Sequence, residues 1–405
     1  MKSNNEIIIN EIADLKYGKS LPDRERKGGP IPVYGSGGIG GYHDKAIVQK
    51  GIIIGRKGSV GTVRFSKTPF YPIDTVFFVD EVKGENDLKF FYYFLQSIGL
   101  SNFDSDAAVP GLNRNLVHKL KAIIPEPKTQ QRIASILSAY DDLIEVNNER
   151  IKLLEETARE LYKEWFVRMR FPEYKKAKFK KGIPTDWRIE PIGKVIDYHI
   201  GGGWGNDNKD NQFSVAGYVI RGTDIPKVRA GQANQDVYRF HKASNMKSRE
   251  LIEGDMVFET AGGSEGQPLG RTCYITQEML DAYGDKVMAA SFCKQIRTTS
   301  IPSLYLYYFL NYLYDTGMIE AYQVQSTGIS NYQFEPFLKF QQIILPKDEL
   351  MQSFHDKAIL MQKQIAILGQ QNTQLRQIRD RLLPRLISGK LEVKPNIILK
   401  QTEQD

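Results

Sequence analysis

The sequence predicts an α+β protein. It would consist of two tandem β-rich units with short helices, separated by two long helices that form an antiparallel coiled coil with pseudo-two-fold symmetry. Three observations predict this fold. The chain repeats itself, each copy ends in a long stretch with heptad periodicity, and the remaining segments are short β-rich runs between Gly-rich turns. The 405 residues and the 41% apolar content suit a folded chain of two or three domains.

The internal repeat is clearest in an aromatic run. Tyr-Tyr-Phe-Leu at residues 92–95 recurs at residues 307–310, and four weaker echoes flank it. Residues 50–54 match 253–257, 61–63 match 270–272, 110–112 match 327–329, and 123–125 match 344–346. The offsets rise steadily through 203, 209, 215, 217 and 221. We therefore predict a divergent tandem duplication with longer loops in the second copy.

The two long helices are predicted by residues at heptad spacing that are apolar except for Asn147. In the first copy these are Ile133, Leu137, Tyr140, Ile144, Asn147, Ile151, Leu154, Ala158, Leu161 and Trp165. In the second copy they are Phe354, Met361, Leu368, Leu375 and Leu382. We expect the helices to pair through Ile144, Asn147, Ile151, Leu154, Leu368, Asn372, Leu375 and Leu382, with the two asparagines fixing the register. Gly369 and Pro384 make the straightness of the second helix doubtful.

These patterns divide the chain into six segments. They are a first unit over residues 1–126, a long helix over 127–170, a Lys-rich linker over 171–184, a second unit over 185–347, a second long helix over 348–390 and a tail over 391–405. Short runs such as residues 51–54 and 75–79 read as strands. Because long helices do not alternate with these strands, a doubly wound parallel sheet is not expected.

Composition excludes several classes of protein. The two cysteines, Cys273 and Cys293, are too few for a disulfide framework or a four-cysteine zinc site, and their apolar neighbours indicate reduced core thiols. No apolar run approaches the roughly 20 residues of a membrane-spanning helix, and the first residues lack a signal-peptide core. We therefore expect a cytoplasmic protein. The formal charge of +7 is compatible with nucleic-acid binding but is weak evidence by itself.

Motifs for catalysis are weak. Residues 35–40 satisfy the Gly-x-Gly-x-x-Gly string, but no amphipathic helix follows, so we expect a surface turn and not a dinucleotide site. Asp74, Glu81 and Lys83 vaguely resemble the acidic and basic residues of metal-dependent nucleases, although no further acidic cluster supports them. The five histidines are dispersed, so no metal site is predicted. The chain is expected to lack a catalytic site.

Several segments carry a resemblance to one known family: residues 21–22, 32–38 and Tyr42, residues 51–61, Pro125 with residues 130–137 and 141–144, and residues 388–391. With these segments the layout resembles the specificity (S) subunit of Type I restriction–modification systems over nearly the whole chain. The resemblance implies two target-recognition domains held apart by conserved helices, each reading one half of a split, asymmetric sequence in double-stranded DNA. Helix length would then set the unread spacer.

The resemblance also implies the partners. Two modification subunits would bind S-adenosylmethionine and methylate adenine, and restriction subunits would add ATP-driven, Mg²⁺-dependent translocation and cleavage. These cofactors would belong to the partners, and none is expected in this chain.

Candidate DNA contacts are residues whose side chains can bond base edges or phosphates. In the first unit they are Lys19, Arg24, Arg26, Lys27, Tyr34, Ser36, Tyr42, Arg56, Lys57, Ser59, Asn113 and Arg114. In the second unit they are Trp204, Asn206, Lys209, Arg221, Thr223, Thr260, Ser264, Gln267, Ser326, Asn331 and Tyr332. Two other functions stay open at this stage, a nuclease acting through Asp74, Glu81 and Lys83, and a coiled-coil adaptor that binds only protein.

Overall fold

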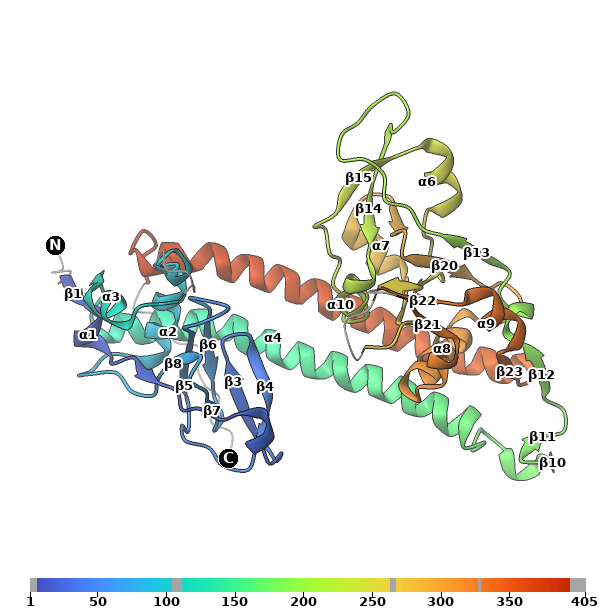
Figure 1. The fold of residues 1–405 in the computed structure, drawn as a ribbon, viewed down its shortest axis with the longest axis horizontal. Helices are drawn as coiled ribbons and strands as arrows, with labels where there is room; N and C mark the ends of the chain where they lie inside the picture. Colours follow the sequence, from blue (N-terminus) through green and yellow to red (C-terminus); the bar gives the residue numbers. More distant parts are fainter. Residues whose placement is uncertain (1–5, 104–110, 263–266, 327–328, 394–405) are drawn as a thin grey trace. The chain divides into compact units, whose positions relative to one another are not determined.

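A computed structural model describes residues 6–103, 111–262, 267–326 and 329–393. Its contacts divide the chain into two compact units, residues 1–143 with 375–405 (unit 1) and residues 144–374 (unit 2). Two long helices, α4 (Pro127–Tyr162) and α10 (Asp348–Ile387), contribute residues to both units (Figure 1). Each unit therefore contains a β-rich part and paired segments of these two helices.

The described residues of unit 1 form three sheets. Figure 1 labels most of their strands. The four-stranded antiparallel sheet has the order β2-β8-β5-β6, the three-stranded sheet has the order β4-β3-β7, and β1 pairs with β9. The strands are β1 Glu6–Ile8, β2 Lys16–Tyr17, β3 Ile31–Gly35, β4 Gly38–His43, β5 Gly51–Gly55, β6 Val63–Ser66, β7 Tyr71–Pro72, β8 Val76–Val79 and β9 Lys121–Ile123. The short helices are α1 Ile9–Ile12, α2 Leu88–Ser97 and α3 Arg114–Lys119, with 3₁₀ turns at Asp23–Glu25 and Leu100–Phe103.

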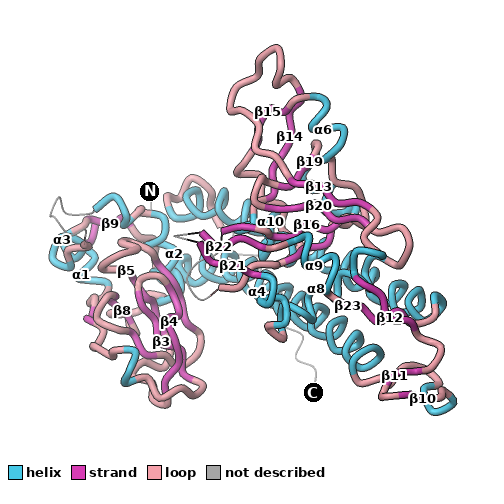
Figure 2. The backbone as a smooth tube through the Cα atoms, turned by 45° about the vertical axis from the view of Figure 1, so that its right-hand side comes forward, coloured by secondary structure: helices cyan, strands magenta, loops and turns pink. Residues whose placement is uncertain are grey.

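Unit 2 contains the corresponding sheets, β13-β20-β16-β18, β15-β14-β19 and β12-β23, and two further ones, β17-β22-β21 and β10-β11. The strands are β10 Phe179–Lys180, β11 Ile183–Pro184, β12 Arg188–Pro191, β13 Tyr198–Gly201, β14 Val215–Ile220, β15 Tyr238–His241, β16 Met256–Glu259, β17 Ala261–Gly262, β18 Thr272–Tyr274, β19 Val287–Ala289, β20 Cys293–Arg297, β21 Gln323–Ser326, β22 Ile329–Tyr332 and β23 Gln342–Leu345. The helices are α5 Ile225–Arg229, α6 Ala243–Arg249, α7 Gln277–Tyr283, α8 Ser303–Asp315 and α9 Phe334–Phe340. Figure 2 shows the helices and strands coloured by type. The 3₁₀ turns of this unit are Tyr174–Lys176, Ile192–Lys194, Gly222–Asp224 and Met318–Tyr322.

The sheet topology confirms the predicted duplication. The four-stranded sheets of the two units have the same strand order, and each three-stranded sheet joins one antiparallel and one parallel pair around its central strand. The recurrent aromatic run also lies on equivalent helices, residues 92–95 on α2 and 307–310 on α8. The α+β fold with two long paired helices is thus as the sequence predicts.

The backbone hydrogen bonds correct the register of the repeat. Leu112 donates its amide to the carbonyl of Arg56, and Tyr332 donates to the carbonyl of Thr260 in the same way. The counterpart of Leu112 is therefore Tyr332, three residues beyond the predicted Ile329. The offset also does not rise throughout. It is 217 between β8 and β20 but 215 between α2 and α8, because the connection to the helix is shorter in unit 2.

The core of unit 1 lies where α2 packs on the four-stranded sheet and on the long helices. Phe90, Phe94 and Leu95 of α2 are buried there with Ile133 and Leu137 of α4 and Leu386 of α10. Asp87 caps α2 by accepting the Phe90 amide at 2.7 Å. The buried Tyr93 hydroxyl donates to Asp141 of α4, which also pairs with Arg379 of α10. Burial and this hydrogen bond raise the pKa of Tyr93, so the phenol stays protonated and keeps its bond to the helix.

A buried glutamine ties the beginning of α4 to the rest of unit 1. Pro127 occupies the first position of α4, where its missing N–H costs no helical hydrogen bond. Gln130 is 1% exposed, and its side chain donates to the Pro125 carbonyl and the Asn86 side chain and accepts the Asp87 amide. All its hydrogen-bonding groups find protein partners. This network connects the N-termini of α2 and α4.

In unit 2, α4 and α10 pair in antiparallel directions. Ile151 and Leu154 of α4 pack with Ile365 and Leu368 of α10. One layer on, Asn147 donates Nδ2–H to Oδ1 of Asn372 at 3.0 Å, and Asn372 in turn donates to Asn148 at 2.9 Å. Both paired asparagines are almost completely buried. Among the other predicted seam residues, Ile144 is buried, Leu375 is half-buried, and Leu382 packs against the core of unit 1.

The first long helix differs from its predicted form at its C-terminal end. The α-helix ends at Tyr162, and Lys163–Val167 form one π-helical turn instead of a continuation to residue 170. The wider turn buries both Trp165 and Phe166, which are adjacent in sequence, against Tyr162 and Phe354. The heptad pattern alone could not indicate this change, because it includes Trp165 but not Phe166.

Gly369 does not interrupt α10, which is helical from Asp348 to Ile387 through both Gly369 and Pro384. The glycine is needed for space. A Cβ at Gly369 would lie 2.3 Å from the carbonyl carbon of Gly231 and 2.5 Å from the carbonyl oxygen of Ala230, at the end of α5. The backbones of α5 and α10 can approach this closely only because no side chain intervenes.

Replacing Gly369 with Ala is therefore expected to destabilise unit 2 by about 1–3 kcal/mol, because backbone must move to admit the methyl group. Helix propensity alone predicts the opposite sign, a gain of about 1 kcal/mol. Thermal denaturation of the purified chain measures the difference. Gln371→Ala, at an exposed position of the same helix, serves as the control and should leave the melting temperature nearly unchanged. A higher melting temperature for Gly369→Ala would contradict the close packing.

Candidate nucleic-acid interface

Two arginines of unit 1 lie against one exposed tyrosine. Tyr17 ends β2 and is 49% exposed, Arg56 follows β5, and Arg114 begins α3. The Cζ atoms of Arg56 and Arg114 lie 5.1 and 5.0 Å from the centre of the Tyr17 ring, within cation–π range. Arg56 is also 5.9 Å from the Phe77 ring and donates Nη1–H to the Asp74 carbonyl at 2.9 Å. We call Tyr17, Arg56, Phe77 and Arg114 the arginine cluster.

The positive charge of this cluster has no acidic ion-pair partner within the described part of the chain. Among the residues that the structure describes, neither Arg56 nor Arg114 forms an ion pair, and the buried Nε of Arg114 has no hydrogen-bond partner. The aromatic ring holds the two guanidinium groups in place without consuming their N–H donors. Such preorganised donors suit an acceptor-rich, anionic partner such as DNA.

Two further candidates of unit 1, Lys57 and Ser59, follow Arg56 in the chain, and a hydrogen bond connects their loop to the turn that contains Ser36. The carbonyls of Ser36 and Ser59 both accept the Thr62 hydroxyl, at 3.2 and 3.0 Å, which brings the β3–β4 turn to the loop after β5. Lys57 and Ser59 are exposed in that loop. Tyr34 packs edge-on against Phe70, whereas Tyr42 on β4 is 51% exposed.

Several other candidates use their polar groups to hold the fold. Arg26 donates to the Gly40 carbonyl at 2.6 Å and pairs with Asp23 at 2.6 Å, which fixes the β3–β4 hairpin. Asn113 caps α3 by accepting the amides of Asn115 and Leu116. Lys19, Arg24 and Lys27 are exposed and remain the more accessible positive charges of this unit.

In unit 2 an exposed tryptophan lies beside an arginine that sequence reasoning missed. Arg239 of β15 places its Cζ 4.7 Å from the centre of the Trp204 ring and pairs with Asp207 at 2.5 Å. Asn206 pairs with Phe240 through backbone hydrogen bonds, and Lys209 is exposed in the same loop. The structure therefore gathers Trp204, Asn206 and Lys209 around the end of β13.

The remaining candidates of unit 2 are more scattered. Arg221 donates Nε–H and Nη2–H to the buried Asp224, and its guanidinium is thereby committed to the fold. Asp224 keeps a lowered pKa against its burial because of these bonds. Thr260 donates to the Phe292 carbonyl at 3.1 Å. Thr223 and Asn331 are exposed and Gln267 is half-buried, whereas Ser264 and the side chain of Ser326 lie outside the described residues.

Tyr332 is corrected from a surface candidate to a core residue. It is 7% exposed, and its ring contacts Phe258, Tyr322 and Phe337. The physical reason is its place in the repeat, since its counterpart Leu112 is also buried in its unit. A buried ring cannot stack on a base in this conformation.

Sequence reasoning missed Tyr17, Phe77, Arg239, Lys294 and Phe334. Lys294 of β20 lies 4.9 Å above the Phe334 ring at the beginning of α9. Residues 16–19, Lys-Tyr-Gly-Lys, are a basic run around one aromatic and are the one local signal that could have indicated Tyr17. The pairs of Lys294 with Phe334 and of Arg239 with Trp204 join residues 40 and 35 positions apart, so only the fold reveals them.

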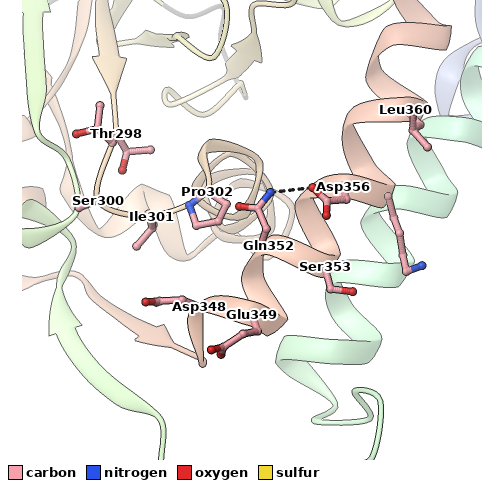
Figure 3. Close-up of a pocket in the computed structure, with 12 residues that line it drawn as sticks. Thr298, Ser300, Ile301, Pro302, Asp348, Glu349, Gln352, Ser353, Asp356 and Leu360 are labelled. Atoms are coloured by element: carbon pink, nitrogen blue, oxygen red, sulfur yellow. Dashed lines mark hydrogen bonds between the residues drawn. The ribbon is translucent and has the colours of Figure 1, made fainter.

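A large hollow in unit 2 has the wrong charge for DNA. It measures 1040 Å³ and lies between residues 298–302 and the first turns of α10 (Figure 3). Asp348, Glu349 and Asp356 line it, and Gln352 donates to Asp356 at 2.7 Å. Carboxylates would repel the phosphate backbone, so this hollow is not part of the interface.

The weak catalytic motifs do not form sites. Asp74 precedes strand β8 and Glu81 follows it, so the strand separates them, and the Lys83 ammonium donates to the Asn10 carbonyl at 2.5 Å. Residues 35–40 form the β3–β4 hairpin turn. In the described part of the chain, no three His, Cys, Asp or Glu residues are grouped to hold a metal ion. Cys273 and Cys293 are free and buried, and burial raises the pKa of Cys273 to about 12, which makes it a poor nucleophile.

No helix in the described ranges is both long enough and apolar enough to cross a membrane.

Comparisons with known proteins agree with this picture. Residues 1–156 match the family described as Type I restriction modification DNA specificity domain. The chain is 24% identical to the Type I restriction enzyme MjaIX specificity subunit of Methanocaldococcus jannaschii, over 95% of this chain and 93% of that protein. It is 28% identical to the Type I restriction enzyme EcoprrI specificity subunit of Escherichia coli, over 33% of this chain and 35% of that protein.

The fold is also known from a solved structure. The Type-I restriction-modification system S subunit from M. genitalium superimposes with a TM-score of 0.58 at 17% identity, covering 95% of this chain and 97% of that one. Its fold is therefore shared with this chain, including the two long helices. By sequence, residues 1–156 carry a Type I restriction modification DNA specificity domain, and nearly the whole chain is similar to a Type I specificity subunit, the non-catalytic DNA target-recognition subunit of these systems.

Proposed function

We propose that the chain reads a bipartite, asymmetric sequence in double-stranded DNA, one half with each unit. The observation that carries this proposal is the repeated sheet topology with different side chains on its surface. Two copies of one scaffold suit two half-sites, as in dimeric DNA-binding proteins. Because the copies have diverged, the half-sites would differ. The recognition domains would be residues 1–126 and 185–347, joined by helices 127–170 and 348–390 with the linker 171–184, and followed by the tail 391–405.

The partners in this proposal are two modification subunits that methylate adenine, and restriction subunits that translocate and cleave DNA in the cytoplasm. Exposed apolar residues on the paired helices of unit 2 support a protein-binding role for these helices. Val146 and Leu153 on α4 are 49% and 61% exposed, and Leu360 and Ile367 on α10 are 69% and 39% exposed. Apolar groups facing solvent at helical spacing favour a docking surface. S-adenosylmethionine, ATP and Mg²⁺ would be bound by the partners.

DNA binding by the complex of this chain with its modification subunits is expected to be specific and to weaken steeply with salt. Each phosphate contact by Lys or Arg releases counterions, so affinity should fall about 10³–10⁵-fold between 50 and 200 mM salt if six to ten contacts form. Electrophoretic mobility shifts at several salt concentrations measure this. Sequencing of adenine methylation in cells that express the complex should then give a split motif with two different halves.

The same experiments separate the alternatives. A coiled-coil adaptor predicts no salt-sensitive binding even with modification subunits present. A nuclease predicts Mg²⁺-dependent cleavage by the purified chain that is lost in Asp74→Ala. Because Asp74 and Glu81 lie at opposite ends of a strand, we expect no such cleavage.

A further inference from the structure

The two units carry different side chains on equivalent backbone positions. We call the backbone hydrogen bonds that recur in both units the shared frame. Gly18 and Gly202 donate their amides to Val76 and Cys293, the first residues of β8 and β20. Both positions are tightly packed, since an added Cβ would lie 2.0 Å from the Ile73 carbonyl oxygen at Gly18 and 2.2 Å from the Ala289 carbonyl oxygen at Gly202. This close contact fixes the end of β2 in unit 1 and of β13 in unit 2 in the same way.

Two more hydrogen bonds extend the frame. Arg56 donates its amide to Thr75 and Thr260 donates to Phe292, both at 2.9 Å. The Leu112 and Tyr332 amides then bond the carbonyls of Arg56 and Thr260, and helices α3 and α9 begin two residues later in both units. Backbone hydrogen bonds alone therefore identify Arg56 of unit 1 and Thr260 of unit 2 as equivalent positions, although their side chains differ.

The arginine cluster has a counterpart at every position. Tyr17 corresponds to Gly201, Arg56 to Thr260, Phe77 to Lys294 and Arg114 to Phe334, by strand register and by helix start. In unit 1 two guanidinium groups lie on one tyrosine, whereas in unit 2 one ammonium group lies on one phenylalanine. The backbone hydrogen bonds are thus the same in both units, whereas the side chains at the equivalent positions differ.

The arrangement of the arginine cluster suits a base edge better than a phosphate. Arg56 is held by two aromatic rings and by the Asp74 carbonyl, and Arg114 is held by Tyr17. A guanidinium group fixed in this way presents paired donors in one plane, the geometry that matches O6 and N7 of guanine. Exposed lysines such as Lys57 lack that restraint and suit phosphate.

We propose that this shared position determines specificity in both units. Arg56 and Arg114 would bond guanine in the half-site read by unit 1, whereas Thr260 and Lys294, which have no planar pair of donors, would make a different contact in the other half-site. This inference rests on the proposed function and identifies the base class and the residues that would read it.

The test exchanges side chains between equivalent positions of the two units. It uses the full chain in complex with its modification subunits. Arg56→Thr with Arg114→Phe installs the unit 2 residues in unit 1, and Thr260→Arg does the reverse at one position. The control Lys128→Gln with Arg132→Gln also removes two positive charges from unit 1, but from α4 instead of from the arginine cluster. Melting temperatures near that of the wild type establish that each variant is folded.

Binding is measured on duplexes in which each guanine of the methylated motif is replaced in turn by 7-deazaguanine, which lacks the N7 acceptor. The wild type should lose affinity about fivefold or more at one guanine of a single half-site. The double variant should bind the unmodified duplex and the duplex with 7-deazaguanine at that position equally well. Its methylation motif should accept other bases at the same position. The control should keep the wild-type base preferences. Thr260→Arg should change only the other half of the motif.

Two results would overturn the assignment. One is unchanged sensitivity to every 7-deazaguanine in the double variant together with an unchanged motif. The other is loss of all DNA binding by both the folded double variant and the folded control, which would indicate that the arginines contact phosphates. The proposed function fails separately, if the wild-type complex methylates no split sequence at all.

Discussion

Replacing residues 1–126 with the matching segment of another specificity subunit is expected to change one half of the methylated sequence and leave the other half unchanged. The physical reason is that each unit has its own core. Buried residues of the first 126 cluster with one another and with residues of α4 and α10, and the buried clusters of unit 2 contain none of them. Sequencing of adenine methylation in cells measures both halves at once.

The exchange must keep the contact between the new domain and the helices. Ile133, Leu137 and Leu386 would pack against the incoming counterpart of α2, and Gln130 would need an acceptor and a donor in place of Asn86 and Asp87. The matched control replaces residues 185–347, which should change the half that the first exchange leaves intact. If either exchange altered both halves, recognition would not be modular.

Replacing Asn147 with Leu is expected to destabilise unit 2 by about 1–3 kcal/mol, the cost of leaving a buried polar group unpaired. Asn372 is 0% exposed, and a leucine side chain has no N–H to donate to its Oδ1 atom, as Asn147 does at 3.0 Å. Asn372→Leu should cost a similar amount. The double replacement should be near neutral or stabilising, because two apolar side chains then meet in the seam.

Urea denaturation of the four proteins gives the coupling between the two asparagines. We expect the two single losses to be strongly non-additive in the double variant. Gln371→Leu, exposed on the same helix, controls for the added apolar surface. Single variants as stable as the wild type would show that the hydrogen bond contributes nothing to the seam. A stable double variant would indicate that the asparagine pair is kept for register and not for stability.

Local patterns predicted much of the fold because they repeat. The heptad spacing predicted the seam in which Ile151 and Leu368 pack. The repeated aromatic run predicted that α2 and α8 are equivalent. Both Tyr93 and Tyr308 bond a long helix through their hydroxyl groups, although Tyr93 donates to Asp141 of α4 and Tyr308 accepts from Gln362 of α10.

Positions that depend on close contact between distant segments could not be predicted. Gly369 looked like a weak point of its helix until the Gly231 backbone was seen beside it. Tyr332 was a candidate because a tyrosine side chain can bond base edges or phosphates, and only the fold shows that its ring is buried against Phe258 and Phe337. The π turn after Tyr162 follows from the burial of Phe166 and not from any helix signal.

The sequence by itself determined that the chain is a duplication with two long helices and, through its motifs, which family it resembles, since periodicity and repeats are properties of neighbouring residues. Only the tertiary structure decided which residues share a surface. Tyr17, Arg56 and Arg114 are spread over 98 positions of the chain and meet because the ends of β2 and β5 and the start of α3 lie at one place. Hydrogen bonds between neighbouring strands bring these residues together. The sequence of one strand does not reveal which residues of the next strand lie opposite it.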